Sequence, residues 1–196
     1  MLTLFRPNLE RNAAELAYCR IVEQARQPGF FLDGGVPDTV DGRFELICLH
    51  AFLYLHRLRG EQSRSARFGR RFVAAMFADF DRSLREMGTG DLSVGREVKR
   101  MAEGFYGRFA AYEDGLAADD AALQAALARN LFGTTAPDPA QLAAMVCYVR
   151  GQAVALRRQG TDALLAGEIA FGDPAVSVGS PVPAGAAVQP DRAMQS

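Results

Sequence analysis

Apolar residues recur along most of the chain at steps of three or four, the spacing of a helix that buries one face. No stretch alternates apolar and polar residues with the period of two that a half-buried strand requires. Glycine and proline divide this pattern into segments that predict helices over about 12–27, 43–59, 63–87, 91–116, 121–131 and from 138 to about 156, with a short turn at 161–170. The sequence therefore predicts an all-α protein, a single bundle of about six helices.

The predicted helices differ in how much of their surface is apolar. The segment 43–59 is apolar nearly all round, which is typical of a helix in the middle of a bundle. The first segment presents a narrower set, from which we expect Leu16, Tyr18 or Cys19, Ile21 and Val22 to be buried.

The segments 63–87 and 91–116 each carry one apolar stripe, and a glycine-rich corner joins them. The two stripes consist of Phe68, Phe72, Met76, Phe80, Leu84 and Met87, and of Val94, Val98, Met101, Phe105, Phe109 and Tyr112. Gly88 stands where a left-handed cap would end the first helix, and Asp91 or Ser93 can cap the second. We expect two amphipathic helices whose charged sides face outward.

The composition changes near the C-terminus. From Gly172 onward the chain is rich in glycine, proline, alanine and valine, with few large side chains. Such a segment cannot bury enough surface to offset its ordering entropy. We therefore expect a helical domain over residues 1–171 and a disordered tail over 172–196.

Charge and cysteine content narrow the function classes. The chain has 196 residues and a net charge of −1, which argues against a generally basic nucleic-acid binder, and we expect no DNA partner. Cys19, Cys48 and Cys147 lie far apart and form no CxxC pair, so we expect buried thiols in a reducing compartment. Without a secretory signal or a long apolar run, the sequence predicts a cytoplasmic protein.

No catalytic or metal-binding constellation is evident. His50 and His56 are six residues apart, which places them on different faces of one helix, whereas a metal pair needs a spacing of three or four. A hydrogen-bonded core histidine is the favoured interpretation for His50. We therefore expect a protein that is not an enzyme, with no catalytic residue, metal or cofactor.

A basic run spans Arg57–Arg71 and holds Arg57, Arg59, Arg64, Arg67, Arg70 and Arg71 against Glu61 alone. Such a cluster could bind RNA, the ribosome or an anionic membrane surface. It could equally be a solvated corner whose arginines pair with acidic residues elsewhere. An RNA- or ribosome-binding adaptor is thus a second hypothesis for the function.

The outward side of the segment 91–116 indicates a partner surface. Opposite its apolar stripe lie Arg96, Lys99, Arg100, Glu103 and Gly107, with Tyr106 adjacent. Gly107 costs about 1 kcal/mol relative to alanine inside a helix, and it does not face the core. Either a partner approaches the backbone there, or another helix of the domain packs on it, or the helix frays. Together with Asp81, Arg82 and Arg85 of the preceding helix, these residues form the predicted docking site.

Two blocks carry a resemblance to a known family. LREMGTGDLSVGREVKRMAEGFYGRFAAYE (Leu84–Glu113) and GVPDTVDGRFELICLHAFLYLHRL (Gly35–Leu58) resemble the ubiquinol–cytochrome c chaperone family. The resemblance implies a non-enzymatic assembly factor for ubiquinol–cytochrome c reductase, here a bacterial member. It also implies cytochrome b as the client, bound when newly made, and work beside the ribosome or the inner-membrane surface.

Overall fold

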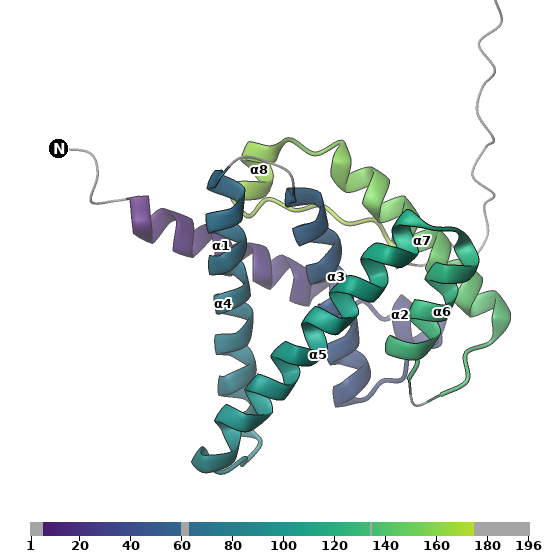
Figure 1. Ribbon diagram of the computed structural model, residues 1–196, viewed down its shortest axis with the longest axis horizontal. Helices are drawn as coiled ribbons and strands as arrows, with labels where there is room; N and C mark the ends of the chain where they lie inside the picture. The colour runs from purple at the N-terminus through teal and green to yellow at the C-terminus, as the bar shows by residue number, and fades with distance from the viewer. Residues whose placement is uncertain (1–5, 60–62, 134, 175–196) are drawn as a thin grey trace, which may run out of the picture.

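The computed structural model describes residues 6–59, 63–133 and 135–174, and every regular element in these ranges is a helix. The predicted all-α class is therefore confirmed. The six predicted helices are present, α8 occupies part of the predicted final turn, and the single turn α2 falls in a segment predicted as loop. In chain order the helices are α1 (Arg6–Ala25), α2 (Gly29–Leu32), α3 (Val40–Leu58), α4 (Ser63–Glu86), α5 (Asp91–Ala117), α6 (Asp120–Asn130), α7 (Pro139–Arg157) and α8 (Thr161–Leu165) (Figure 1).

Helix α3 lies in the middle of the molecule and packs against α1, α4, α5 and α7 (Figure 1). Its start is set by Thr39, whose side-chain oxygen accepts a hydrogen bond from the Gly42 amide at 3.1 Å. The side chains buried along it include Leu46, Leu49, Phe52, Leu53, Tyr54 and Leu58. Burying each large apolar side chain stabilises the fold by about 1.5–3 kcal/mol, so the central position predicted for this helix follows from its composition.

Helix α4 buries most of its predicted stripe against α1 and α3. The C-terminal end of the stripe extends beyond these helices and is not covered. Phe68, Phe72, Met76 and Phe80 are buried, whereas Met87, just beyond the helix, is 59% exposed. The contact with α1 also has a polar component, because the Tyr18 hydroxyl donates to Asp79 at 2.8 Å. The far end of α4 therefore extends past the core.

The turn between α4 and α5 is closed by backbone hydrogen bonds. Gly88 has φ of 86°, and the Thr89 amide bonds the Leu84 carbonyl at 3.0 Å, which confirms the predicted left-handed cap. The predicted side-chain cap of the next helix is wrong. Gly90 occupies that position without a side-chain bond, and Asp91 instead pairs with Arg85.

Helix α6 packs across α5 at a point where only glycine fits. A Cβ atom on Gly115 would lie 2.9 Å from the Cα atom of Leu123, closer than real contacts allow. Leu123 and Leu127 of α6 are fully buried, so the close approach of the two backbones completes this part of the core.

The predicted burial on α1 and α7 is partly wrong. Leu16 is 42% exposed, and Cys19 and Cys147 are exposed, whereas Cys48 is buried as expected. Tyr18 and Ile21 are buried as predicted, and Ala14, Ala17 and Ala25 complete the covered side of α1. These residues follow helical spacing, but three are alanines, and a stripe of small residues is not distinguished by hydropathy from its larger neighbours.

His50 is a core histidine with both ring nitrogens bonded, as predicted. Nδ1 lies 2.7 Å from the Leu46 carbonyl and therefore carries the proton, while Nε2 accepts from the Tyr148 hydroxyl at 2.8 Å. That hydroxyl in turn accepts from Gln24 at 2.9 Å. The chain of bonds links α1, α3 and α7, and burial lowers the pKa of His50 to about 4 from 6.5.

The predicted start of the C-terminal tail falls at the edge of the described residues. Gly172 donates its amide hydrogen to Gln152 at 2.9 Å, and its carbonyl accepts from Gln24 at 2.9 Å. The rest of the predicted tail, from residue 175 to 196, lies outside the described residues.

Two glycine-to-alanine substitutions separate packing from helix propensity. Gly151→Ala, where a Cβ meets nothing within 4 Å, should raise the free energy of unfolding by up to about 1 kcal/mol. Gly115→Ala should lower it by about 1–3 kcal/mol, because the Leu123 backbone has to move. Urea unfolding followed by circular dichroism measures both changes, and equal stabilisation by the two variants would contradict the described α5–α6 contact.

Stability should also depend on pH through His50. Its pKa is lower in the folded than in the unfolded state, so its contribution is complete above pH 6.5 and is lost as pH falls toward 4. This loss amounts to about 2 kcal/mol between pH 7 and pH 5. His56, whose pKa burial also lowers, adds a loss of the same sign. Urea unfolding at both pH values should therefore show a smaller loss in His50→Gln than in the parent, and identical losses would exclude the effect.

Candidate functional site

The predicted docking residues lie at the end of α4 and along α5 as far as Gly107, on either side of the turn that projects from the body at the lower left of Figure 1. Asp81 is half-buried and the others are exposed. We call this surface the corner face; it comprises Asp81, Arg82, Arg85, Met87, Leu92, Arg96, Lys99, Arg100, Glu103, Tyr106 and Gly107. The outward sides of both helices are therefore open to solvent.

The charged residues of the corner face form mainly local ion pairs. Arg85 bonds Asp81 at 2.7 Å, as the i,i+4 spacing predicts, and lowers the pKa of that carboxyl. Lys99 lies 3.8 Å from Glu103, one helical turn away. Such exposed pairs contribute only about 0.2–0.5 kcal/mol each, so a partner can replace them at little cost.

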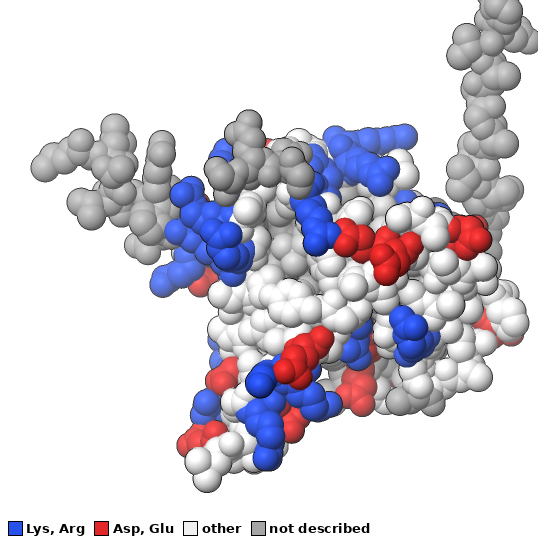
Figure 2. Space-filling model, in the orientation of Figure 1, with Lys and Arg blue, Asp and Glu red and all other residues white. Residues whose placement is uncertain are grey.

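Two cations of the corner face differ in their pairing. Arg82 pairs with Asp79 and not with Glu86, because Asp79 is the acid already held in place by Tyr18. Arg96 is exposed and forms no ion pair within the part of the chain that the structure describes. Figure 2 shows positive and negative side chains interspersed over this corner.

Apolar side chains stand among these charges. Leu92 is 100% exposed, and Met87 and Tyr106 are each 59% exposed. Met87 belongs to the predicted core stripe, whereas Leu92 was not among the predicted contact residues. The position of both residues beside the turn could have indicated their exposure, because no described helix packs over that end of the molecule.

Gly107 has no packing role among the described residues. A Cβ atom at this position would meet no atom within 4 Å, so no other helix of the described ranges packs on it. It lies well inside α5, away from either end where a helix frays. Packing by another described helix and fraying therefore do not explain Gly107. Close approach by a partner stays a prediction.

A buried ion pair holds α5 against α3 beneath this surface. Arg108 binds Glu45 through two hydrogen bonds, and its guanidinium lies 5.6 Å from the Phe44 ring centroid. Burial raises the pKa of Glu45, an effect that Arg108 opposes. The sequence pattern did not mark this pair, although Glu45 directly precedes the apolar run from Leu46, where a buried acid requires a basic partner nearby.

The polar groups around this pair are sealed from solvent. Cys48 is completely buried, and burial raises the pKa of its thiol well above the ordinary value, which disfavours the reactive thiolate. The Tyr112 hydroxyl is buried without a hydrogen-bond partner in the described ranges. Groups so enclosed support the position of α5 and offer no access to a substrate.

The arginines of the Arg57–Arg71 run engage in long-range contacts. Arg57 bonds the Leu156 and Gln159 carbonyls, each at 3.0 Å, where α7 ends. Four others pair with acids from distant segments: Arg59 with Glu113, Arg64 with Asp162, and Arg67 and Arg71 with Glu10. Arg70 is exposed. These contacts correspond to the predicted alternative in which the cluster pairs with acids elsewhere.

Two features are absent from the described ranges. Their histidine, cysteine, aspartate and glutamate side chains form no group of three placed to hold a metal ion. None of the described helices is both long and apolar enough to cross a bilayer.

The chain is similar to proteins of one family. The family model described as ubiquinol–cytochrome C chaperone matches residues 32–171. A Xenopus laevis protein named ubiquinol-cytochrome-c reductase complex assembly factor 1 is 32% identical over 81% of this chain and 80% of its own length. The Mus musculus protein of that name is 34% identical over 80% of this chain, which spans only 54% of the mouse protein.

A solved structure shares the fold as well. The crystal structure of the Cbp3 homologue from Brucella abortus aligns with a TM-score of 0.77 and 39% sequence identity. The alignment covers 88% of this chain and 97% of the Brucella chain.

The pair beneath the corner face should be important for stability. Arg108→Ala leaves the Glu45 carboxylate buried without its partner, which should lower the free energy of unfolding by about 3 kcal/mol. Arg96→Ala, on the exposed side of the same helix, should change it by less than about 0.5 kcal/mol. Replacing both members of the pair by leucine should restore most of the loss. Urea unfolding tests all three variants, and an unaffected Arg108→Ala protein would exclude the bridge.

Proposed function

Because the chain belongs to the ubiquinol–cytochrome c chaperone family, we propose that it is a non-enzymatic assembly factor that binds newly made cytochrome b during biogenesis of ubiquinol–cytochrome c reductase. The names of its relatives support the reductase as the complex that is assembled. The identity of the client, cytochrome b, is the more specific part of the proposal.

The corner face is the observation that carries this proposal. It combines exposed apolar side chains with charges held only in weak local pairs, the composition expected where a protein contacts another protein reversibly. Leu92 and Met87 can contact apolar side chains of a membrane protein that has not yet been assembled. Arg96, Lys99 and Arg100 can contact acidic or carbonyl groups beside such a segment.

Holding a client requires reversible contacts and no chemical step. The weak pairs on the corner face exchange at low cost, and Gly107 leaves a stretch of α5 without a side chain. A partner helix can approach the backbone closely at such a position. We further propose that the protein works in the cytoplasm at the inner-membrane surface, beside the ribosome, where such a client is made and inserted.

The RNA-binding hypothesis has less support. A site for phosphate groups needs cations that are free to release counterions, and four of the six arginines in the run already contact carboxylates. Figure 2 shows basic side chains over the end of α4 opposite the corner, with acidic ones beside them. The corner face therefore remains the preferred partner surface.

Charge reversal on the corner face tests the proposal. The triple variant Arg96→Glu, Lys99→Glu, Arg100→Glu should recover about tenfold less cytochrome b than the parent when each protein is purified from cells, because attraction becomes repulsion. Quantitative mass spectrometry measures the client, and the spectrum of b haem in membranes measures assembled reductase.

The matched control reverses three exposed arginines elsewhere, Arg26, Arg129 and Arg158. It should retain client capture within about twofold, since isolated surface substitutions have small effects. Equal capture by both triple variants would exclude the corner face. Normal reductase in a strain without the gene would exclude the proposed function.

A further inference from the structure

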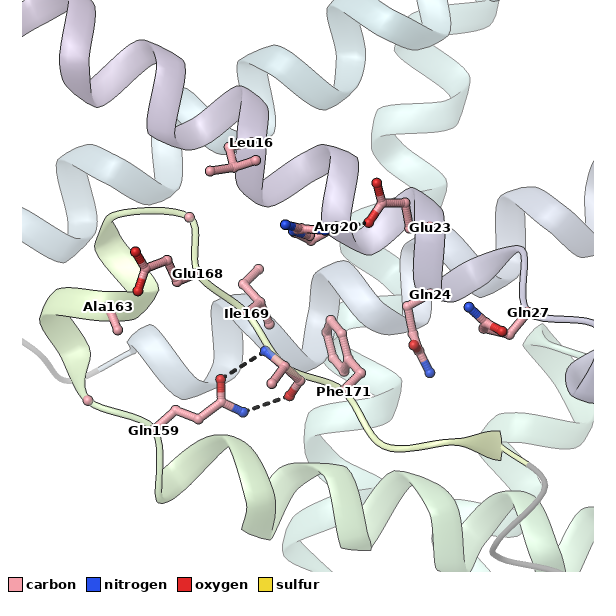
Figure 3. Close-up of a pocket in the computed structure, with 13 residues that line it drawn as sticks. Leu16, Arg20, Glu23, Gln24, Gln27, Gln159, Ala163, Glu168, Ile169 and Phe171 are labelled. Carbon is pink, nitrogen blue, oxygen red and sulfur yellow. Dashed lines mark hydrogen bonds and ion pairs between the residues drawn. The ribbon is translucent and has the colours of Figure 1, made fainter.

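A second surface, remote in sequence from the corner face, has the features of a peptide site. A groove of about 540 Å³ lies between α1 and the segment 167–172, which we call the strap (Figure 3). The volume falls within the range of sites that bind small ligands or short peptide segments, about 300–1,000 Å³. Its lining includes Leu16, Arg20 and Glu23 of α1 and Glu168, Ile169 and Phe171 of the strap.

The strap is fixed at both ends. At one end Gly167 has φ of 86°, and a Cβ atom there would lie 2.6 Å from the Ala13 carbonyl oxygen, so the strap touches α1 directly. At the other end, Gln152 and Gln24 bond the amide and the carbonyl of Gly172. Between these points the strap spans the mouth of the groove as an ordered segment.

One edge of the strap is already paired. Gln159 donates to the Ala170 carbonyl at 2.7 Å and accepts from the Ala170 amide at 3.0 Å, as a neighbouring strand would (Figure 3). In an extended segment, consecutive residues direct their backbone groups to opposite edges. The amides and carbonyls of Ile169 and Phe171 therefore face away from α7, and they form no hydrogen bond to any described residue.

The lining of the groove carries a net negative charge and one exposed leucine, which together favour an uncharged segment with an apolar side chain. Leu16 is 42% exposed, although it is an apolar residue on a helix with a well-packed opposite side. Arg20 is neutralised by Glu23 at 2.9 Å, and Glu168 adds a negative charge, which disfavours phosphate and other anions. A ligand that itself carries amides and carbonyls at the spacing of a strand can pair with the open backbone groups of the strap.

We propose that this groove binds an extended apolar peptide segment, which pairs as a strand with the backbone of Ile169 and Phe171 and places a side chain against Leu16. This inference rests on the proposed chaperone function and assigns a second contact for the client. Backbone pairing provides affinity with little dependence on the client's sequence, as in other cases of strand addition. The strap is held in place before binding, so little ordering is required.

The test uses the full-length protein and a short fluorescein-labelled peptide that alternates leucine and threonine, followed by fluorescence anisotropy. Leu16→Asp places a charge in the groove and should weaken binding at least about tenfold. Leu32→Asp is the matched control, since Leu32 is 79% exposed and lies outside the groove, and it should bind within about twofold of the parent.

Two further peptides distinguish strand pairing from nonspecific apolar binding. One is N-methylated at its odd-numbered residues and the other at its even-numbered residues. Only one edge of the peptide faces the strap, so one methylated peptide should lose binding and the other should retain it. Equal binding by both, or no effect of Leu16→Asp, would overturn the proposal. Binding seen only in a chain cut after Pro174 would also overturn it, because the chain's own C-terminal residues would then be the occupant.

These outcomes are separate from those of the proposed function. A deletion strain that lacks assembled reductase, together with a protein that ignores the peptide, would reject the groove and leave the assembly role in place.

Discussion

The arrangement of the whole molecule follows from one constraint, which is that α3 has almost no polar side to expose. A helix apolar on every side has to be covered on every side, and α1, α4, α5 and α7 provide that cover. Its one buried acid adds a second requirement, since Glu45 needs a cation within the core, and Arg108 of α5 supplies it. The contact between Glu45 and Arg108 therefore fixes the orientation of α5 against α3. The direction in which the corner face points follows from that orientation.

The ion pairs on the surface are of two kinds, which differ in the sequence distance between the paired residues. At the start of α4 and the end of α3, arginines reach acids 54 to 98 residues away and join helices that are distant in sequence. On the corner face, most pairs connect residues three or four positions apart within one helix. The first kind links segments that are distant in sequence, whereas the second kind stays within one helix, so its loss leaves the packing between helices unchanged. This difference is the physical reason for placing a reversible partner on the corner.

The sequence predicted the features that depend on local periodicity. The six longer helices, the left-handed cap at Gly88, the central position of α3 and the bonded state of His50 all follow from spacing and composition within a short window. The outward direction of Arg96 and Gly107 follows from the same periodicity. Features that depend on distant segments could not be obtained in this way. The pairing of Glu45 with Arg108 joins residues 63 positions apart, and the exposure of Leu16 depends on the strap 150 residues later in the chain.

The three glutamines that hold the strap have a mechanical consequence. Gln24 belongs to α1, while Gln152 and Gln159 lie on or directly after α7, and their amide contacts measure 2.7 to 3.0 Å. Hydrogen bonds of this length weaken steeply when stretched by about 0.5 Å. A small separation of α1 from α7 would therefore break the Gln24 bond and leave the bonds from Gln152 and Gln159 in place. The strap would thus stay with α7 when α1 moves, because two of its three glutamine contacts come from that side.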